Sequence, residues 1–141
     1  MLTVTQAQMD VLDTQWITRM VDRVRSAVRA SADMAALARD GAPVTPVDDA
    51  AIDKCIAWGV DFGLTEAADL ACAAALLVAI RQHDHQGQLA WMKSWLDSPQ
   101  ASPPVRLQLV LAQLRDLIAT RPVAARVHAQ VERARKGMEA R

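Results

Sequence analysis

Residues 59–66, Gly59-Val60-Asp61-Phe62-Gly63-Leu64-Thr65-Glu66, predict the end of one helix and the start of the next. Gly63 offers the backbone freedom that a helix end needs, and the hydroxyl of Thr65 can cap the following helix. A joint this short forces the two helices into contact. The stretch therefore predicts a compact helical domain.

The same helical pattern extends outward from the joint in both directions. Apolar residues recur every three or four positions, and β-branched alternation is absent. Six or seven helices are expected, over about residues 5–30, 33–39, 46–62, 66–82, 88–96, 103–118 and 122–135. Thr45 is expected to cap the third of them, with Pro46 at its first position. We predict an all-α fold, a compact single-domain bundle over residues 1–141, with a frayed basic end at about residues 137–141.

Composition and charge restrict the class of protein. The 141 residues are 52% apolar, which is enough for one domain with a core. The 16 basic and 16 acidic side chains balance, which argues against a non-specific nucleic-acid binder. The charges are spread unevenly, because residues 33–70 are mostly acidic and residues 121–141 mostly basic. These segments can attract each other or a partner, or they can be two solvated faces.

The two cysteines and the N-terminus bear on location. Cys55 and Cys72 lie within apolar helical patterns and are expected to be buried thiols in a reducing compartment. A disulfide between them remains an alternative if their helices pack at the right height. Residues 1–6 lack a basic flank and a long apolar run, so no secretory signal is expected. The longest uncharged apolar run, Leu70–Ile80, has eleven residues, whereas a membrane-spanning helix needs about 20. We expect a cytoplasmic protein that does not enter a membrane.

Few residues suggest catalysis or metal binding. The glycines form no phosphate-binding loop, and no serine lies in a nucleophile elbow. His83-Asp84-His85 is the one cluster of metal-ligand type, and His128 could join it only if the fold brought it near. Neighbours in sequence rarely converge on one ion, so we expect solvated loop residues, with His83 capping the end of the preceding helix. We predict no enzyme activity, no metal and no cofactor.

The paired carboxylates also favour a structural interpretation. Asp48-Asp49 and the pair Glu66 and Asp69 fall in the first turns of predicted helices. Acid–base catalysis needs two carboxyl groups with separated pKa values in a protected cleft. In a first helical turn a carboxylate instead stabilises the helix dipole by about 0.3–1 kcal/mol.

The tryptophans and the C-terminal apolar stripes can serve a core or an interface. Trp16 and Trp58 fall on core stripes, whereas Trp91 and Trp95 share one face of a helix too short to bury both sides. Packing in the core is favoured for all four, but one of the latter pair could be exposed as an interface anchor. The stripes of residues 107–118 and 123–131 are expected to close the core of the monomer, with a homodimer seam as the alternative.

Several short segments follow one another along the chain in a familiar order. They are Gln6-Ala7-Gln8-Met9-Asp10, Arg19-Met20, Val24-Arg25, the joint from Ala57 to Asp69, Trp95-Leu96-Asp97 and Arg106-Leu107. This order resembles that of small helical proteins encoded in bacterial type VI secretion operons, beside spike and effector genes. The family often has a Gly-x-x-Phe-Asp-like element after the fourth helix, where this chain has residues 82–86, Gln-His-Asp-His-Gln. The resemblance implies a non-enzymatic accessory protein that contacts a secreted effector as adaptor, chaperone or immunity protein.

We therefore expect a protein-binding module whose partner is a secreted effector or toxin. Trp91, Trp95, Asp61, Glu66 and Asp69 are the residues expected to contact it. An acidic surface suits a basic partner, because complementary charge speeds encounter and disfavours wrong partners. The alternative is a nucleic-acid-binding or regulatory protein that uses the basic C-terminal helix. Its candidate residues are Arg126, Arg133, Arg135 and Lys136.

Overall fold

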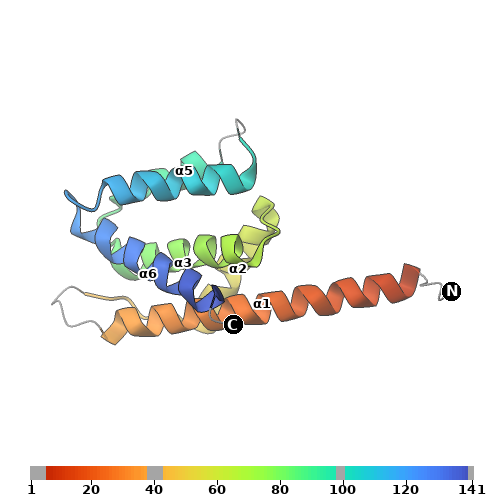
Figure 1. Ribbon diagram of the computed structural model, residues 1–141. Helices are drawn as coiled ribbons and strands as arrows, with labels where there is room; N and C mark the ends of the chain where they lie inside the picture. Colours follow the sequence, from red (N-terminus) through yellow and green to blue (C-terminus); the bar gives the residue numbers. More distant parts are fainter. Residues whose placement is uncertain (1–5, 38–42, 98–100, 140–141) are drawn as a thin grey trace.

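The computed structural model describes residues 6–37, 43–97 and 101–139, with the backbone alone for residues 6–14. These residues form an all-α bundle without a β-strand, as predicted. Its helices are α1 (Gln6–Leu37), α2 (Asp49–Phe62), α3 (Ala67–His83), α4 (Trp91–Leu96), α5 (Pro103–Asp116) and α6 (Pro122–Glu139). In Figure 1, α1 runs along the bottom, α2, α3 and α6 form the middle, and α5 lies at the top.

Helix α3 is the centre of the bundle, as its small residues predict. It packs against α1, α2, α5 and α6, and its side chains are buried on all sides. The buried apolar residues of α3 are Leu70, Ala71, Cys72, Ala73, Ala74, Ala75, Leu76, Val78 and Ala79. Alanine at five of these nine positions lets the neighbouring helices approach closely, because a methyl group needs little space.

The joint between α2 and α3 ends α2 as the sequence predicts. Gly63 has φ 110° and ψ 19°, the left-handed conformation that glycine adopts without a Cβ clash. Its N–H donates to the Val60 carbonyl at 3.1 Å, and the Leu64 N–H donates to the Gly59 carbonyl at 3.2 Å. This pair of bonds is the Schellman motif, and Leu64 is buried beneath it. The predicted capping by Thr65 is wrong: Glu66 holds the N-cap position of α3, and no side-chain hydrogen bond caps the helix.

We expect Gly63→Ala to lower the free energy of unfolding by about 1–2 kcal/mol, the usual cost of the left-handed conformation for a residue with a Cβ. The added Cβ would also lie 3.1 Å from Cγ of Pro103, which begins α5. Gly87→Ala is the matched control, because Gly87 also has positive φ but has no atom within 4 Å of an added Cβ. Urea denaturation should show the larger loss for Gly63→Ala, and equal losses would contradict a role for the Pro103 contact.

Helix α1 continues through a predicted break. The sequence predicts one helix to about residue 30 and a second over 33–39, whereas α1 runs unbroken to Leu37. The Ser31 hydroxyl donates to the Val28 carbonyl at 2.8 Å, so this side chain is satisfied inside the helix. Asp33 lies 3.5 Å from the Arg29 guanidinium one turn earlier, which stabilises the helix instead of ending it. Residues 38–42, where the second helix was predicted to end, lie outside the described residues.

Helix α2 begins later than Thr45 and Pro46 predict. Asp48 is the N-cap, and its carboxylate accepts a hydrogen bond from the Ala51 N–H at 2.8 Å. Asp49, in the first turn, accepts one from Arg29 of α1 at 2.5 Å. The structural interpretation of these two carboxylates is thus confirmed. The Thr45 N–H instead donates to the Gln82 carbonyl at 2.9 Å and fastens the preceding loop to α3.

Helices α4, α5 and α6 close the core of the single chain. The apolar side chains that are fully buried in these helices, together with Leu89 just before α4, are Met92, Leu96, Leu107, Val110, Leu114, Ala124, Val127, Val131 and Ala134. The apolar stripes of α5 and α6 are therefore used mainly inside the monomer, and a homodimer stays a prediction. Helix α6 also runs to Glu139, with Met138 buried, so the predicted fraying of residues 137–139 is wrong.

Three polar side chains form a directional chain through the interior. His83 Nε2 lies 3.0 Å from Gln130 Oε1, and Gln130 Nε2 donates to Gln82 Oε1 at 2.6 Å. Gln82 Nε2 then donates to the Ala32 carbonyl at 3.3 Å. Because α1, α3 and α6 each contribute, this chain joins the first, central and last helices of the bundle. Nothing in the residue pattern predicts it, since each position alone resembles a surface polar residue.

The cysteines are free and buried, as predicted, so the disulfide alternative is wrong. Burial raises the pKa of the Cys55 thiol, and it raises that of Cys72 to about 11. Both thiols therefore stay protonated at neutral pH.

Among the described helices, none combines the length and the apolar character that crossing a bilayer requires.

Candidate functional site

The first half of α1 projects beyond the rest of the bundle. Figure 1 shows this part, in red, extending past the other helices. Its 32 residues give α1 a length of about 48 Å, whereas the 17 residues of α3 give about 26 Å. Helices of such different length cannot cover α1 along its whole apolar stripe. We call residues 6–19 of α1 the projecting arm.

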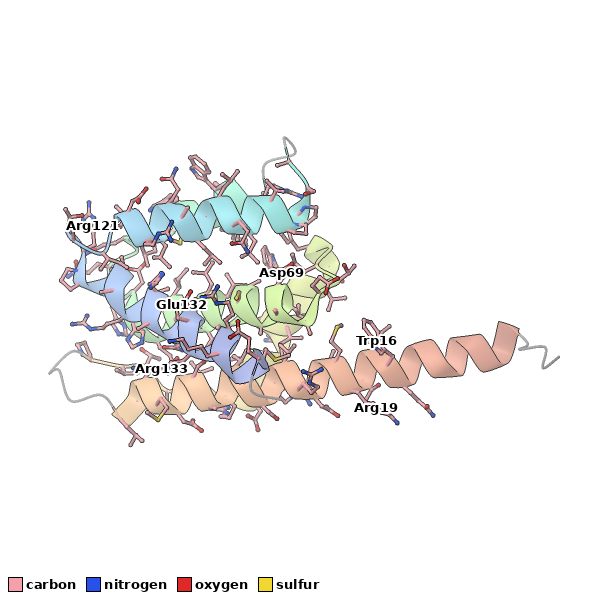
Figure 2. All side chains as sticks on the ribbon, viewed as in Figure 1. Trp16, Arg19, Asp69, Arg121, Glu132 and Arg133 are labelled. Atoms are coloured by element: carbon pink, nitrogen blue, oxygen red, sulfur yellow. The ribbon has the colours of Figure 1, made fainter. Side chains whose placement is uncertain are left out.

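The stripe of α1 changes from buried to exposed where the projecting arm begins. Val24 and Val28 are fully buried, and Met20 is 8% exposed. Trp16, one turn before Met20, is 59% exposed, and its neighbour Ile17 is 46% exposed. Figure 2 shows Trp16 on the side of α1 that faces the other helices, but beyond their edge, whereas Arg19 points to the opposite side.

The prediction that Trp16 packs in the core is therefore wrong. The periodicity correctly places Trp16 on the same face as Met20 and Val24, but periodicity does not tell where the covering helices stop. A signal was present in the sequence, because a predicted helix of about 26 residues exceeds its neighbours in length. Trp16 is thus an exposed aromatic side chain on the projecting arm, which the sequence pattern did not predict.

Trp91 and Trp95 lie on one face of α4, as predicted. Their ring centroids are 6.3 Å apart, and the planes meet at 78°, an edge-to-face contact. Trp91 packs partly against the core, whereas Trp95 is 46% exposed. The favoured prediction of core packing is therefore wrong for Trp95, and the alternative of one exposed ring applies.

The acidic residues Asp61, Glu66 and Asp69 gather at the α2–α3 joint. Asp61 and Glu66 are exposed, and Asp69 is partly buried in the first turn of α3. Burial, and secondarily the charge of Glu66, raises the pKa of Asp69. Figure 1 places the joint at the end of the bundle from which the projecting arm extends. No contact in the described structure joins these acids to the α4 tryptophans, so the predicted residues form two groups.

The prediction of solvated loop residues holds for His85, which is exposed, but not for His83 and Asp84. His83 is buried and binds Gln130, so it neither lies in solvent nor caps the carbonyls of α3. The Asp84 carboxylate accepts hydrogen bonds from the backbone N–H groups of Gln88 and Leu89, at 2.8 and 2.7 Å. It therefore shapes the turn that leads into α4. Within the described parts of the chain, no group of three or more His, Cys, Asp or Glu residues is arranged to hold a metal ion.

The basic C-terminal helix is partly neutralised by its own residues. Arg135 forms an ion pair with Glu132 one turn earlier. Arg126 and Arg133, two turns apart on α6, line one depression, whereas Figure 2 shows Arg121 apart from Arg133, just before α6 begins.

Comparison of the chain with models of known families, with curated proteins and with solved structures gives no match.

Proposed function

We propose that this chain is a protein-binding module that holds its partner against the projecting arm of α1. The observation that carries the proposal is the exposure of Trp16 and Ile17 on a helix whose next apolar positions are buried. An aromatic and a β-branched side chain on an uncovered helix face are typical of an interface, where Trp is enriched among the residues that dominate binding energy. A partner helix that continued the packing of the bundle would cover both.

Charge supports a partner with a basic surface beside the arm. Asp61, Glu66 and Asp69 lie at the same end of the bundle as the arm, and none of them forms an ion pair within the described residues. Unpaired carboxylates at an interface rim steer a basic partner and raise its association rate. The more specific proposal, based on the sequence resemblance, is that the partner is a secreted bacterial effector and that this chain acts as adaptor, chaperone or immunity protein.

The nucleic-acid alternative has no comparable support. The chain has balanced charge, and the ion pair between Arg135 and Glu132 removes one of the candidate cations. We therefore retain the protein-binding function alone.

Site-specific photo-crosslinking tests the proposal. A photo-reactive amino acid at position 17 in cells that make the chain should form a covalent adduct with one protein, whereas the same residue at exposed position 113 on α5 should not. Mass spectrometry of the adduct then identifies the partner, and purified partner allows the affinity to be measured.

Replacement of Trp16 gives the quantitative prediction. We expect Trp16→Ala to weaken binding by about 30-fold or more, since truncating a Trp anchor typically costs about 2 kcal/mol or more. The free energy of unfolding should change by less than about 0.5 kcal/mol, because the ring is largely exposed. Trp95→Ala is the matched control and should retain most of the affinity. If the partner bound the Trp16→Ala variant with unchanged affinity but no longer bound the Trp95→Ala variant, the interface would lie on α4 instead.

A further inference from the structure

A separate apolar groove lies between α2, α3 and α4. Its volume is about 370 Å³, at the lower end of the range of about 300–1,000 Å³ for small-molecule sites. Apolar side chains from all three helices line it, among them Trp58, Leu76, Ile80, Met92 and Leu96. The groove is thus concave and mostly hydrophobic.

Three cations surround this groove, one from each wall. They are Lys54 of α2, Arg81 of α3 and Lys93 of α4. All three are exposed, and none of them takes part in an ion pair or hydrogen bond within the described residues. No acidic side chain lines the groove. Lys54 and Arg81 also line an adjoining depression with Asp48, whose carboxylate accepts a hydrogen bond from the Ala51 N–H. The groove therefore combines an apolar floor with a positive rim whose cations form no ion pair within the described residues.

The thiol in the wall adds no opposing charge. Cys55 lines the groove, and burial raises the pKa of its thiol, while Arg81 acts in the opposite direction. The thiol therefore remains neutral at physiological pH, and the rim stays positive.

The walls of the groove are held in place from outside by Arg106 of α5. Its Nη1 donates to the Leu96 carbonyl at 2.7 Å, and its guanidinium lies 4.7 Å from the centre of the Phe62 ring. Phe62 in turn stacks on Trp58, with 4.9 Å between ring centroids and 11° between planes. One arginine thus fixes a wall residue on α2 and another on α4. Such a preformed site loses less conformational freedom when a ligand binds.

We propose that this groove binds an amphiphilic carboxylate, a small molecule with an alkyl chain and one anionic head group. The alkyl chain occupies the space along Leu76, Ile80 and Met92, and the head group lies among Lys54, Arg81 and Lys93.

Titration of the full chain with three ligands of equal chain length tests the proposal. We expect decanoate to bind in a saturable manner with one molecule per chain. Decyltrimethylammonium, which has the opposite charge, should bind at least about tenfold more weakly. Decanol, which is neutral, should fall between them. Calorimetry measures the affinities. A variant in which the other three tryptophans are replaced by Phe keeps only Trp58, which lines the groove, and a change in its fluorescence on titration reports binding there. Equal affinities for the anionic and cationic ligands would overturn the assignment.

Charge-reversal variants separate the groove from the rest of the surface. The double variant Lys54→Glu, Lys93→Glu should bind decanoate about tenfold or more weakly than the unsubstituted chain does. The same variant should bind the cationic ligand more tightly than the unsubstituted chain does. Lys136→Glu, an exposed lysine on α6, is the control and should leave both affinities unchanged. Circular dichroism confirms that the variants fold. Undiminished decanoate binding by the double variant, or displacement of decanoate by an acidic amphipathic peptide that binds more tightly, would overturn the proposal. Neither result would affect binding of a protein at Trp16.

Discussion

Replacement of Leu70 by alanine is expected to lower the free energy of unfolding by about 2–5 kcal/mol, a large part of the stability of a typical domain. Leu70 is fully buried in the first turns of α3 and packs against α2 at Gly59. The loss combines the transfer of buried carbon atoms to water with the cavity that remains, since neighbouring helices relax only partly. Chemical denaturation followed by circular dichroism measures it.

Two further variants make this result specific. Leu109→Ala removes the same atoms from a side chain that is 49% exposed and should change stability by less than about 0.5 kcal/mol. A Cβ at Gly59 would lie 2.6 Å from Leu70 Cδ1, so Gly59→Ala fills space that Leu70→Ala vacates. The double variant should therefore be more stable than the sum of the single effects predicts, by about 0.5 kcal/mol or more. Strict additivity would mean that the two residues do not share this contact.

Replacement of Gln130 by leucine is expected to cost about 2–4 kcal/mol. Gln130 is fully buried, and its amide serves His83 and Gln82 at 3.0 and 2.6 Å. Leucine has a similar size but leaves both of these polar groups without the bond that Gln130 supplies, and each such loss costs about 1–3 kcal/mol in the interior. Thermal or urea denaturation should show a lower midpoint with an unchanged slope.

The control for Gln130→Leu is the same substitution at Gln108, which is exposed on α5. It should be nearly neutral. A second variant combines Gln82→Leu with Gln130→Leu and so removes both partners of the bond between these two amides. Its loss of stability should be smaller than the sum of the losses of the two single variants, because fewer unpaired polar groups remain in the interior. If Gln130→Leu proved as mild as Gln108→Leu, the buried chain would contribute little to stability.

Most helices could be predicted from the sequence because their boundaries depend on local chemistry. The conformation of Gly63, the central place of α3 and the buried faces of α4, α5 and α6 all follow from residue type and helical spacing. The errors also have a local cause. Ser31 and Asp33 are compatible with either a break or a continuous helix, and bonds to Val28 and Arg29 favour continuity.

The candidate sites were harder to predict because they depend on where helices end in space. Trp16 has the periodicity of a core residue and lacks only a covering neighbour. The cations around the groove, Lys54, Arg81 and Lys93, lie on three separate helices and form no motif in the sequence. Their proximity arises from packing between α2, α3 and α4, which no local pattern encodes. Exposure of Trp95 was the alternative that the shortness of its helix left open, although packing in the core was favoured.

The buried chain of amides also connects distant parts of the polypeptide. Its bonds join residues that are 47, 48 and 50 positions apart in sequence. Closing a loop of about 50 residues costs about 3.5 kcal/mol of chain entropy, whereas a four-residue joint such as that between α2 and α3 costs about 1 kcal/mol. The entropy cost of these long loop closures is offset only when the surrounding leucines and alanines become buried at the same time. The packed parts of α1 and α6 are thereby thermodynamically coupled and should unfold in one cooperative transition, whereas the projecting arm lies outside this coupling.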